Sequence, residues 1–237
     1  MSLSRLLTLL DDKRQQLDQL TARSAAGKDD RLRIYCAKGC NNCCFLAVNS
    51  SFTEAVALTG ALSEQQRYSL NDTLPQLRKI SQQAENLKQF LRLYRQQFGG
   101  CPFLIESGNC GIYPQRPLSC RALLSTRNSS WCAVDFAELH PQEKEAFLSS
   151  LNPAVVAFPT HYLADSQEFG MELEAAVVSE MQNAFGVALS GNLLYQVWLE
   201  SEYKLSQVLD GGFSATRAFL EERQLDLPFL LQLRGTD

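Results

Sequence analysis

The sequence predicts a mostly α-helical protein that contains an irregular, cysteine-rich centre. Two observations favour helices: leucines recur at roughly helical spacing over residues 3–23, and periodic apolar stretches return after the last cysteine. A third observation defines the centre, because all eight cysteines lie between Cys36 and Cys132. The length of 237 residues suits one compact domain. We therefore expect a single domain over 1–237, with the cysteine-rich region 36–132 between helical N- and C-terminal segments.

The composition excludes several classes of protein. Hydrophobic residues make up 45% and charged residues 20% of the chain, which is typical of a globular protein rather than a disordered or collagen-like one. The formal net charge is −4, so the overall field attracts neither nucleic acid nor an anionic membrane surface, and we expect neither as a partner. No apolar run in the sequence reaches the roughly 18 residues that predict a membrane-spanning helix.

The beginning of the chain does not have the pattern of an export signal. The apolar run from Leu3 to Leu10 is short, charged residues follow it at once, and a small-residue cleavage site is missing. We therefore expect a cytoplasmic protein, whose thiols are kept reduced. Under those conditions, clustered cysteines indicate metal or redox sites before they indicate disulfides.

Local signals predict the first helices. The helix over 3–23 is followed by a stretch, 24–34, that we expect to be a loop because it is short of apolar residues. A second helix is expected to begin near Thr53. A third is expected near Ser63, because Ser63 and Gln66 have the spacing of a capping box.

The clearest apolar face, which includes Leu87, Leu91 and Tyr94, predicts one continuous helix over 73–98. Asp72 is the expected N-cap, and the pair Gly99-Gly100 is expected to end the helix. Residues 101–121 predict irregular structure with one small β-hairpin. Helices are expected to return at His140-Pro141, where proline suits the first helical position, and then over 167–189, 193–209 and 215–224.

The cysteines fall into two groups, of which the first has the pattern C-x3-C-x2-C-C and the second is spread along the chain. Soft thiolates bind zinc and iron–sulfur clusters well, whereas calcium and magnesium require oxygen ligands. Disulfides and inert buried thiols are the alternatives. We treat all eight as candidate metal ligands: Cys36, Cys40, Cys43, Cys44, Cys101, Cys110, Cys120 and Cys132.

The adjacent pair Cys43-Cys44 favours a centre with more than one metal atom. Side chains of neighbouring residues in a helical turn diverge by about 100°, which makes it hard for both to bind one ion. Eight thiols are also more than one zinc ion requires. We therefore favour an iron–sulfur cluster over zinc, and we expect the two cysteine groups to meet in space because neither has a complete set of ligands.

Few other side chains are candidates for the chemistry. The cations Arg116, Arg121 and Lys38 lie near cysteines in the sequence, so they either offset thiolate charge or pair with local carboxylates. His161 is a candidate nitrogen ligand, although a lone histidine is more often structural. No catalytic residue can be named. Four glutamates are expected on the solvent-exposed side of a helix: Glu168, Glu172, Glu174 and Glu180.

Three blocks of sequence resemble the YkgJ-type CxxCxxCC cysteine-cluster family of zinc- or iron-chelating domains. The blocks are the cluster from Cys36 to Cys44, the segment Cys101-Pro102-Phe103-Leu104, and the segment from Cys110 to Arg121, and they occur in the expected order. The resemblance covers residues 36–121 and extends towards 132. One departure is that three residues, rather than two, separate Cys36 from Cys40.

Part of that family resembles flagellin lysine methylases, which implies an iron–sulfur cluster and a protein substrate. The spacing C-x3-C-x2-C is also similar to that of radical S-adenosylmethionine enzymes, in which three cysteines hold a 4Fe-4S cluster. Those enzymes use a β/α barrel, and this sequence has no alternating strand–helix pattern and no G-x-G-x-x-G loop. S-adenosylmethionine as a cosubstrate therefore rests on the resemblance alone.

Three functions follow from these observations. The first is a module that holds a 4Fe-4S cluster or zinc and has a structural or partner-binding role. The second is an iron–sulfur-dependent enzyme that modifies a protein or another macromolecule by methyl transfer. The third is a protein that stores or delivers metal. A protein is the expected partner or substrate in the first two.

Overall fold

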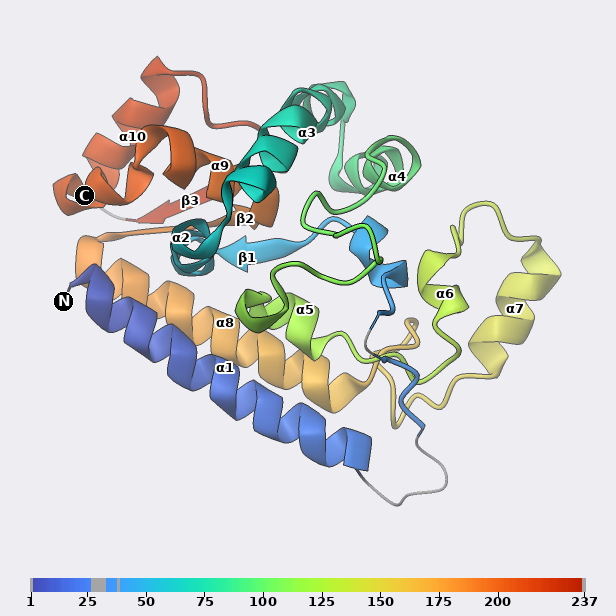
Figure 1. The fold of residues 1–237 in the computed structure, drawn as a ribbon. Coiled ribbons are helices and arrows are strands. Elements are labelled where there is room, and N and C mark those ends of the chain that lie inside the picture. The colour runs from blue at the N-terminus through green and yellow to red at the C-terminus, as the bar shows by residue number, and fades with distance from the viewer. Residues whose placement is uncertain (1, 27–32, 38, 236–237) are drawn as a thin grey trace.

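The structure is a computed structural model that describes residues 2–26, 33–37 and 39–235. It is mostly α-helical, which confirms the predicted fold class. Figure 1 shows α1 and α8 lying side by side along one edge, with α5 packed against them. The described α-helices are α1 (Leu3–Ala26), α2 (Phe52–Ala61), α3 (Glu64–Gln83), α4 (Leu87–Gln97), α5 (Leu118–Ala122), α6 (Ser130–Ala133), α7 (Pro141–Ser149), α8 (Ala164–Phe185), α9 (Leu193–Tyr203) and α10 (Gly212–Glu222).

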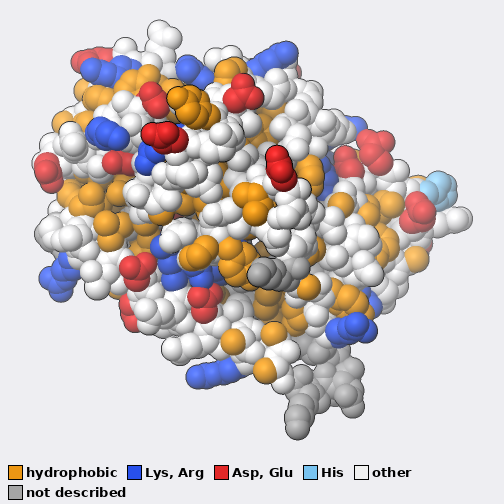
Figure 2. All heavy atoms as spheres, viewed as in Figure 1, with side chains coloured by type: hydrophobic (Ala, Val, Ile, Leu, Met, Phe, Trp, Pro, Cys, Tyr) orange, Lys and Arg blue, Asp and Glu red, His pale blue; other side chains and the backbone are white. Residues whose placement is uncertain are grey.

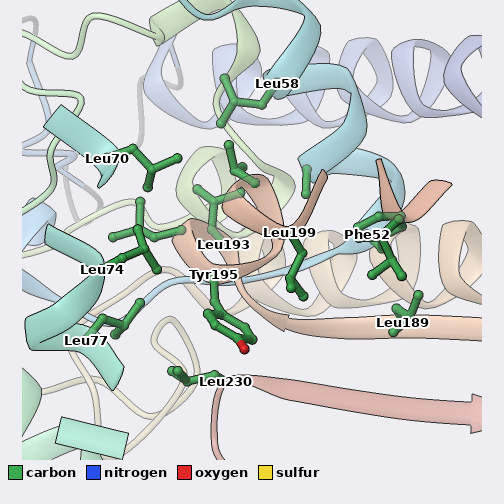
Figure 3. Packing of buried hydrophobic residues seen from close by; sticks show 14 of the residues in the cluster. Phe52, Leu58, Leu70, Leu74, Leu77, Leu189, Leu193, Tyr195, Leu199 and Leu230 are labelled. Carbon is green, nitrogen blue, oxygen red and sulfur yellow. The ribbon is translucent and has the colours of Figure 1, made fainter. Parts of the chain in front are cut away.

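The main hydrophobic core lies between α2, α3, α9 and the sheet (Figure 3). Phe52 at the start of α2 and Tyr195 on α9 are fully buried there. The Tyr195 hydroxyl donates a hydrogen bond of 2.9 Å to the carbonyl oxygen of Leu225, so this buried polar group is satisfied. A smaller core joins α1, α5 and α8 through residues such as Leu10, Leu118 and Val177.

A small antiparallel sheet has the order β1-β2-β3, with strands β1 (Asn49–Ser51), β2 (Val187–Asn192) and β3 (Leu231–Gly235). The sequence predicted a helix over 167–189, and this was wrong only for the residues after Phe185, most of which belong to β2 instead. The helix α8 ends at Phe185, and Gly191 pairs with Leu231 inside the central strand. Gly191 has φ +148, and a Cβ there would lie 2.3 Å from the Leu230 carbonyl oxygen, so the sheet requires glycine at this position.

The helix predicted over 73–98 is two helices. Asp72 lies inside α3, which begins after the capping box formed by Ser63 and Gln66, as predicted. The chain breaks after Gln83 because Asn86 caps a new helix by accepting a hydrogen bond of 2.9 Å from the Gln89 N–H. As a result, Phe90 and Tyr94 are buried. Leu87 and Leu91, which were expected on the buried face, are exposed.

The remaining elements lie close to their predicted places. Helix α1 is longer than expected and includes residues 24–26, whereas 27–32 of the predicted loop lie outside the described residues. Helix α7 begins after the N-cap His140 with Pro141 at its first position, as predicted. The predicted helix 193–209 ends at Tyr203, and the short turns η3 (Leu205–Gln207) and η4 (Leu209–Gly211) connect it to α10. No described helix is long and apolar enough to cross a membrane.

Glu174 on α8 makes the stability of the fold depend on pH. The sequence predicted that this side chain would be exposed to solvent. Glu172 is exposed on the same helix, but Glu174 is half-buried. Burial, and then the neighbouring Glu54 carboxylate, raise the pKa of Glu174 from 4.5 to about 8. The folded state therefore holds this proton more tightly than the unfolded state.

We expect Glu174→Gln to flatten the fall in stability with rising pH. In the wild type, the stabilising contribution of the protonated form is complete below the unfolded pKa and is lost as pH rises through about 8. Denaturant unfolding at several pH values between 5 and 8.5 measures this slope. Glu172→Gln is the matched control and should keep it. An unchanged slope in Glu174→Gln would show that another group causes it.

Candidate metal centre

Cys43 and Cys44 lie together on a single turn of 3₁₀ helix, η1 (Asn42–Phe45). The turn is stabilised by the Cys44 N–H, which donates a hydrogen bond of 2.9 Å to the Asn41 carbonyl oxygen. The Cys43 and Cys44 thiols are in hydrogen-bond contact, and this contact is the largest cause of a strongly raised Cys43 pKa, followed by burial. The two adjacent sulfurs therefore face the same space, contrary to the divergence expected for an α-helical turn.

The second cysteine group lies directly against this turn. The Cys101 N–H donates a hydrogen bond of 2.9 Å to the Cys44 carbonyl oxygen, so the two groups meet in space as predicted. Cys110 forms an antiparallel bridge with Leu104, and two flanking hydrogen bonds, from the Ile105 N–H to the Asn109 carbonyl oxygen and from the Gly111 N–H to the Phe103 carbonyl oxygen, make this a very short form of the expected hairpin. Burial raises the pKa of Cys101 to about 12, and the Cys110 and Cys43 thiols contribute to the rise. These sulfurs lie at the edge of the main core, against which Cys101 and Cys110 pack.

Cys120 belongs to the short helix α5 rather than to an irregular segment. Burial raises its pKa well above the ordinary value, and the thiols of Cys43, Cys101 and Cys110 add to this. The buried ring of Tyr94 lies near these thiols. Burial raises the pKa of Tyr94 most, and the thiols of Cys101, Cys120 and Cys44 raise it further. Five cysteines, from η1, the segment 101–110 and α5, therefore lie near enough to influence one another.

A buried carboxylate positions the helix that carries Cys120. Glu54 is only 1% exposed, and its side chain accepts hydrogen bonds from the Ser51 N–H and hydroxyl, both at 2.9 Å. Its other oxygen accepts a hydrogen bond of 2.7 Å from the Leu118 N–H at the start of α5. One carboxylate thus caps both α2 and α5. The sequence analysis missed Glu54, although Ser51 and Glu54 have capping-box spacing.

Glu54→Ala should therefore destabilise the protein and loosen Cys120. Removing a charged acceptor from two buried partners costs about 2 kcal/mol of unfolding free energy. Chemical denaturation measures the loss, and the rate of Cys120 alkylation in metal-free protein measures the loosening. Glu54→Gln, which keeps an acceptor oxygen, should fall between the alanine variant and the wild type. Equal alkylation rates in all three proteins would refute the positioning role.

Cys132 is in direct contact with His161, and the Cys36 thiol lies near that of Cys132. The Cys132 Sγ lies 3.3 Å from the His161 Nε2, and both residues are buried. The Ser125 N–H donates a hydrogen bond of 3.2 Å to the Cys36 Sγ. Cys36 is exposed as a residue, but burial of its thiol raises its pKa, and the thiols of Cys43, Cys132 and Cys40 add to this.

The two arginines near the cysteines have different roles. Arg121 is buried and forms an ion pair with Asp18 at 2.5 Å, so it supports the fold. Arg116 lies 3.7 Å from the Tyr113 ring centroid, and its charge lowers the pKa of Cys43, Cys110 and Cys120. Lys38 lies outside the described residues. Figure 2 shows acidic and basic side chains scattered over one face rather than one continuous basic area.

The donor atoms suit a metal that prefers sulfur. All eight cysteines are free, and burial raises the thiol pKa of six of them, so these six thiols are protonated until a cation replaces the proton. Within the parts of the chain that the structure describes, no three Cys, His, Asp or Glu side chains already form a ligand set. The assignment of all eight cysteines as metal ligands therefore stays a prediction.

The fold and the site define a helical protein whose cysteines gather into one thiol-rich centre. Residues 35–144 match the CxxCxxCC family, described as a "putative zinc- or iron-chelating domain", which confirms the family expected from the sequence. The match covers a little less than half of the chain and includes all eight cysteines, but not His161. No curated protein and no solved structure matches the chain, so nothing in these comparisons supports the likeness to flagellin lysine methylases.

Proposed function

We propose that the cysteine-rich region of this protein binds an iron–sulfur cluster. The observation that carries the proposal is the convergence of five cysteines, from three segments of the chain, on the turn that holds Cys43 and Cys44. The family description supports chelation of zinc or iron. The number of thiols favours iron, because a structural zinc ion takes four ligands and a cluster presents several metal atoms to nearby sulfurs.

The surroundings support a buried, negatively charged group. Arg116 is not in an ion pair among the described residues, and its buried Nε has no hydrogen-bond partner there. Its positive charge would offset the charge of the thiolates, and its free N–H would be available to a sulfur acceptor. Tyr94 and the adjoining apolar core would keep water from that side. When bound, the cluster would supply either electron transfer or a rigid cross-link between the segments that carry its ligands.

The structure supports the binding role and gives no specific support to methyl transfer. Two surface pockets, of about 240 and 480 Å³, lie at α10 with β3 and at α3 with α9, and no cysteine lines either of them. Storage or delivery of metal would require exchangeable binding, whereas the thiols here lie in a partly buried region. We therefore propose a stable cluster in a structural or partner-binding role.

Metal and sulfide analysis of protein purified without oxygen tests this proposal. We expect brown protein with iron and acid-labile sulfide in similar amounts, and visible absorption that bleaches on reduction with dithionite. The metal should resist removal by a dilute chelator. Colourless protein with stoichiometric zinc and no iron would overturn the cluster. Protein without any metal, or with readily exchangeable metal, would overturn the binding role proposed here.

A further inference from the structure

We propose that the hollow between α3 and α9 binds a short acidic segment of another protein, in which carboxylates alternate with apolar side chains. The hollow is separate from the thiol-rich centre, because no cysteine lines it. The inference therefore does not depend on which metal the cysteines bind. It gives the protein a second site, with a partner of defined chemistry.

The hollow follows one side of α3 for three turns of the helix. Its α3 residues recur every three or four positions, so they form a single stripe. They are Asn71, Leu74, Pro75, Arg78, Lys79 and Gln82. The helix rises about 17 Å from the first of these residues to the last, and an extended chain of about five residues has the same length. The hollow, of about 480 Å³, therefore suits a short segment of chain better than a single small anion.

The inner surface of the hollow is apolar. Helices α3 and α9 pack against each other (Figure 1). The buried side chain of Leu74 and the partly buried indole of Trp198 on α9 line the space beside them. The Arg78 Cζ lies 5.7 Å from the Trp198 ring centroid, a cation–π contact that holds the guanidinium at the hollow. A ligand with apolar side chains can thus pack on the same surface that presents a cation.

The charge that lines the hollow is positive and unbalanced. Arg78 and Lys79 are adjacent, and no acidic side chain in the described parts of the chain forms an ion pair with either of them. None of the described residues that line the hollow is acidic. The exposed amides of Asn71 and Gln82, at its two ends, can donate hydrogen bonds to carboxylate or backbone carbonyl oxygens. These groups together suit a ligand that carries carboxylates.

The sequence around the hollow extends this positive field. Residues 73–100 contain five basic side chains and one acidic side chain, although the whole chain has 22 basic and 26 acidic residues. A short acidic segment is therefore attracted to α3 and α4 and repelled by the rest of the molecule, which determines where it docks. A long polyanion such as nucleic acid would also meet the acidic remainder of the protein. The charge distribution thus favours a short acidic segment.

The competing explanation is that the two cations have no ligand. In that case Arg78 only covers the indole of Trp198, and the exposed Lys79 only interacts with water. The two explanations differ in one measurable property. A binding site distinguishes an acidic peptide from a basic one and depends on these two side chains, whereas a solvated surface does neither.

Fluorescence anisotropy with the full-length protein, purified without oxygen, tests the proposal. The probe is a labelled peptide of three glutamates that alternate with two leucines. We expect saturable binding that weakens as the salt concentration rises. Arg78→Gln combined with Lys79→Gln should weaken binding at least about tenfold. The control, Arg5→Gln combined with Arg23→Gln, removes the same charge from exposed positions on α1 and should match the wild type. Arg78→Glu combined with Lys79→Glu should instead bind the peptide in which lysines replace the glutamates.

The other outcomes separate this site from the metal centre. No saturable binding by the wild type, or equal binding by the double glutamine variant, overturns the acidic-segment site and leaves the metal centre intact. Equal displacement of the peptide by inorganic phosphate or by a ten-residue thymidine strand would indicate a general anion site and would also overturn the proposal. Protein that binds the peptide but contains no metal overturns only the proposed function. Lys79→Gln alone, an exposed change, should weaken binding about threefold and decides the question if the Arg78 variants fold poorly.

Discussion

Cys44→Ser should lose the iron–sulfur cluster and loosen the cysteine-rich region while most of the helical circular dichroism remains. The Cys44 thiol contacts that of Cys43, and its backbone is bonded to Cys101, so it lies where the two cysteine groups join. We expect iron to fall to about a tenth of the wild-type amount or less, because the affinity of a cluster depends on every thiolate that holds it.

The helices should survive because they have cores of their own. Helices α1 and α8 pack with α5 around Leu10 and Val177, and α2 packs with α9 around Phe52. The segments near the cysteines are held by isolated hydrogen bonds and very short helices, so they should depend on the metal for their order.

Limited proteolysis, metal analysis and far-ultraviolet circular dichroism check this prediction on the same sample. Cleavage should become faster within 36–50 and 99–132. Ser130→Ala, an exposed change at the start of α6, is the control and should behave as the wild type. Full iron content in Cys44→Ser would mean that this thiol is not a ligand. Loss of the entire helical signal would mean that the metal holds the whole fold.

Tyr195→Ala should cause the largest loss of stability. The side chain is fully buried in the main core, and its removal leaves a cavity that the surrounding leucines cannot fill. Large-to-small changes of an aromatic core residue cost about 4 kcal/mol. Tyr195→Phe keeps the ring and removes only the hydrogen bond to the Leu225 carbonyl oxygen, which costs about 1 kcal/mol.

Equilibrium unfolding in urea separates the two effects. Because Tyr195 lies outside the thiol-rich centre, Tyr195→Phe should retain its full metal content. A loss in Tyr195→Ala no larger than that in Tyr195→Phe would show that the core collapses around the missing ring. Loss of metal in Tyr195→Phe would show that the core and the centre are coupled more closely than their separation implies.

The sequence predicted well those features that depend on a few neighbouring residues. The capping box at Ser63, the start of α7 at His140-Pro141 and the end of α4 just before Gly99 depend on local hydrogen bonds and local dihedral angles. The meeting of the two cysteine groups was also predictable, because neither group has a complete set of ligands by itself. Their detailed surroundings were not, since contacts such as that of Cys132 with His161 join distant segments.

The failures arose where distant parts of the chain decide the local structure. Residues 187–192 follow a long amphipathic helix and contain apolar residues that also suit a helix, but they form a strand because β1 and β3 supply partners on both sides. Likewise, the periodicity over 73–98 continued across the break before Leu87. The Asn86 cap and the burial of Phe90 outweighed that periodicity.

The bond between the Cys101 N–H and the Cys44 carbonyl oxygen has a consequence for the order of events in the cell. It closes a loop that contains all of α2, α3 and α4, so this whole stretch must be synthesised before the cysteines on either side can meet. A nascent chain that has just exposed residues 36–44 presents four thiols without their partners. A metal centre that takes ligands from both cysteine groups can therefore be completed only after the chain has been synthesised at least as far as Cys101.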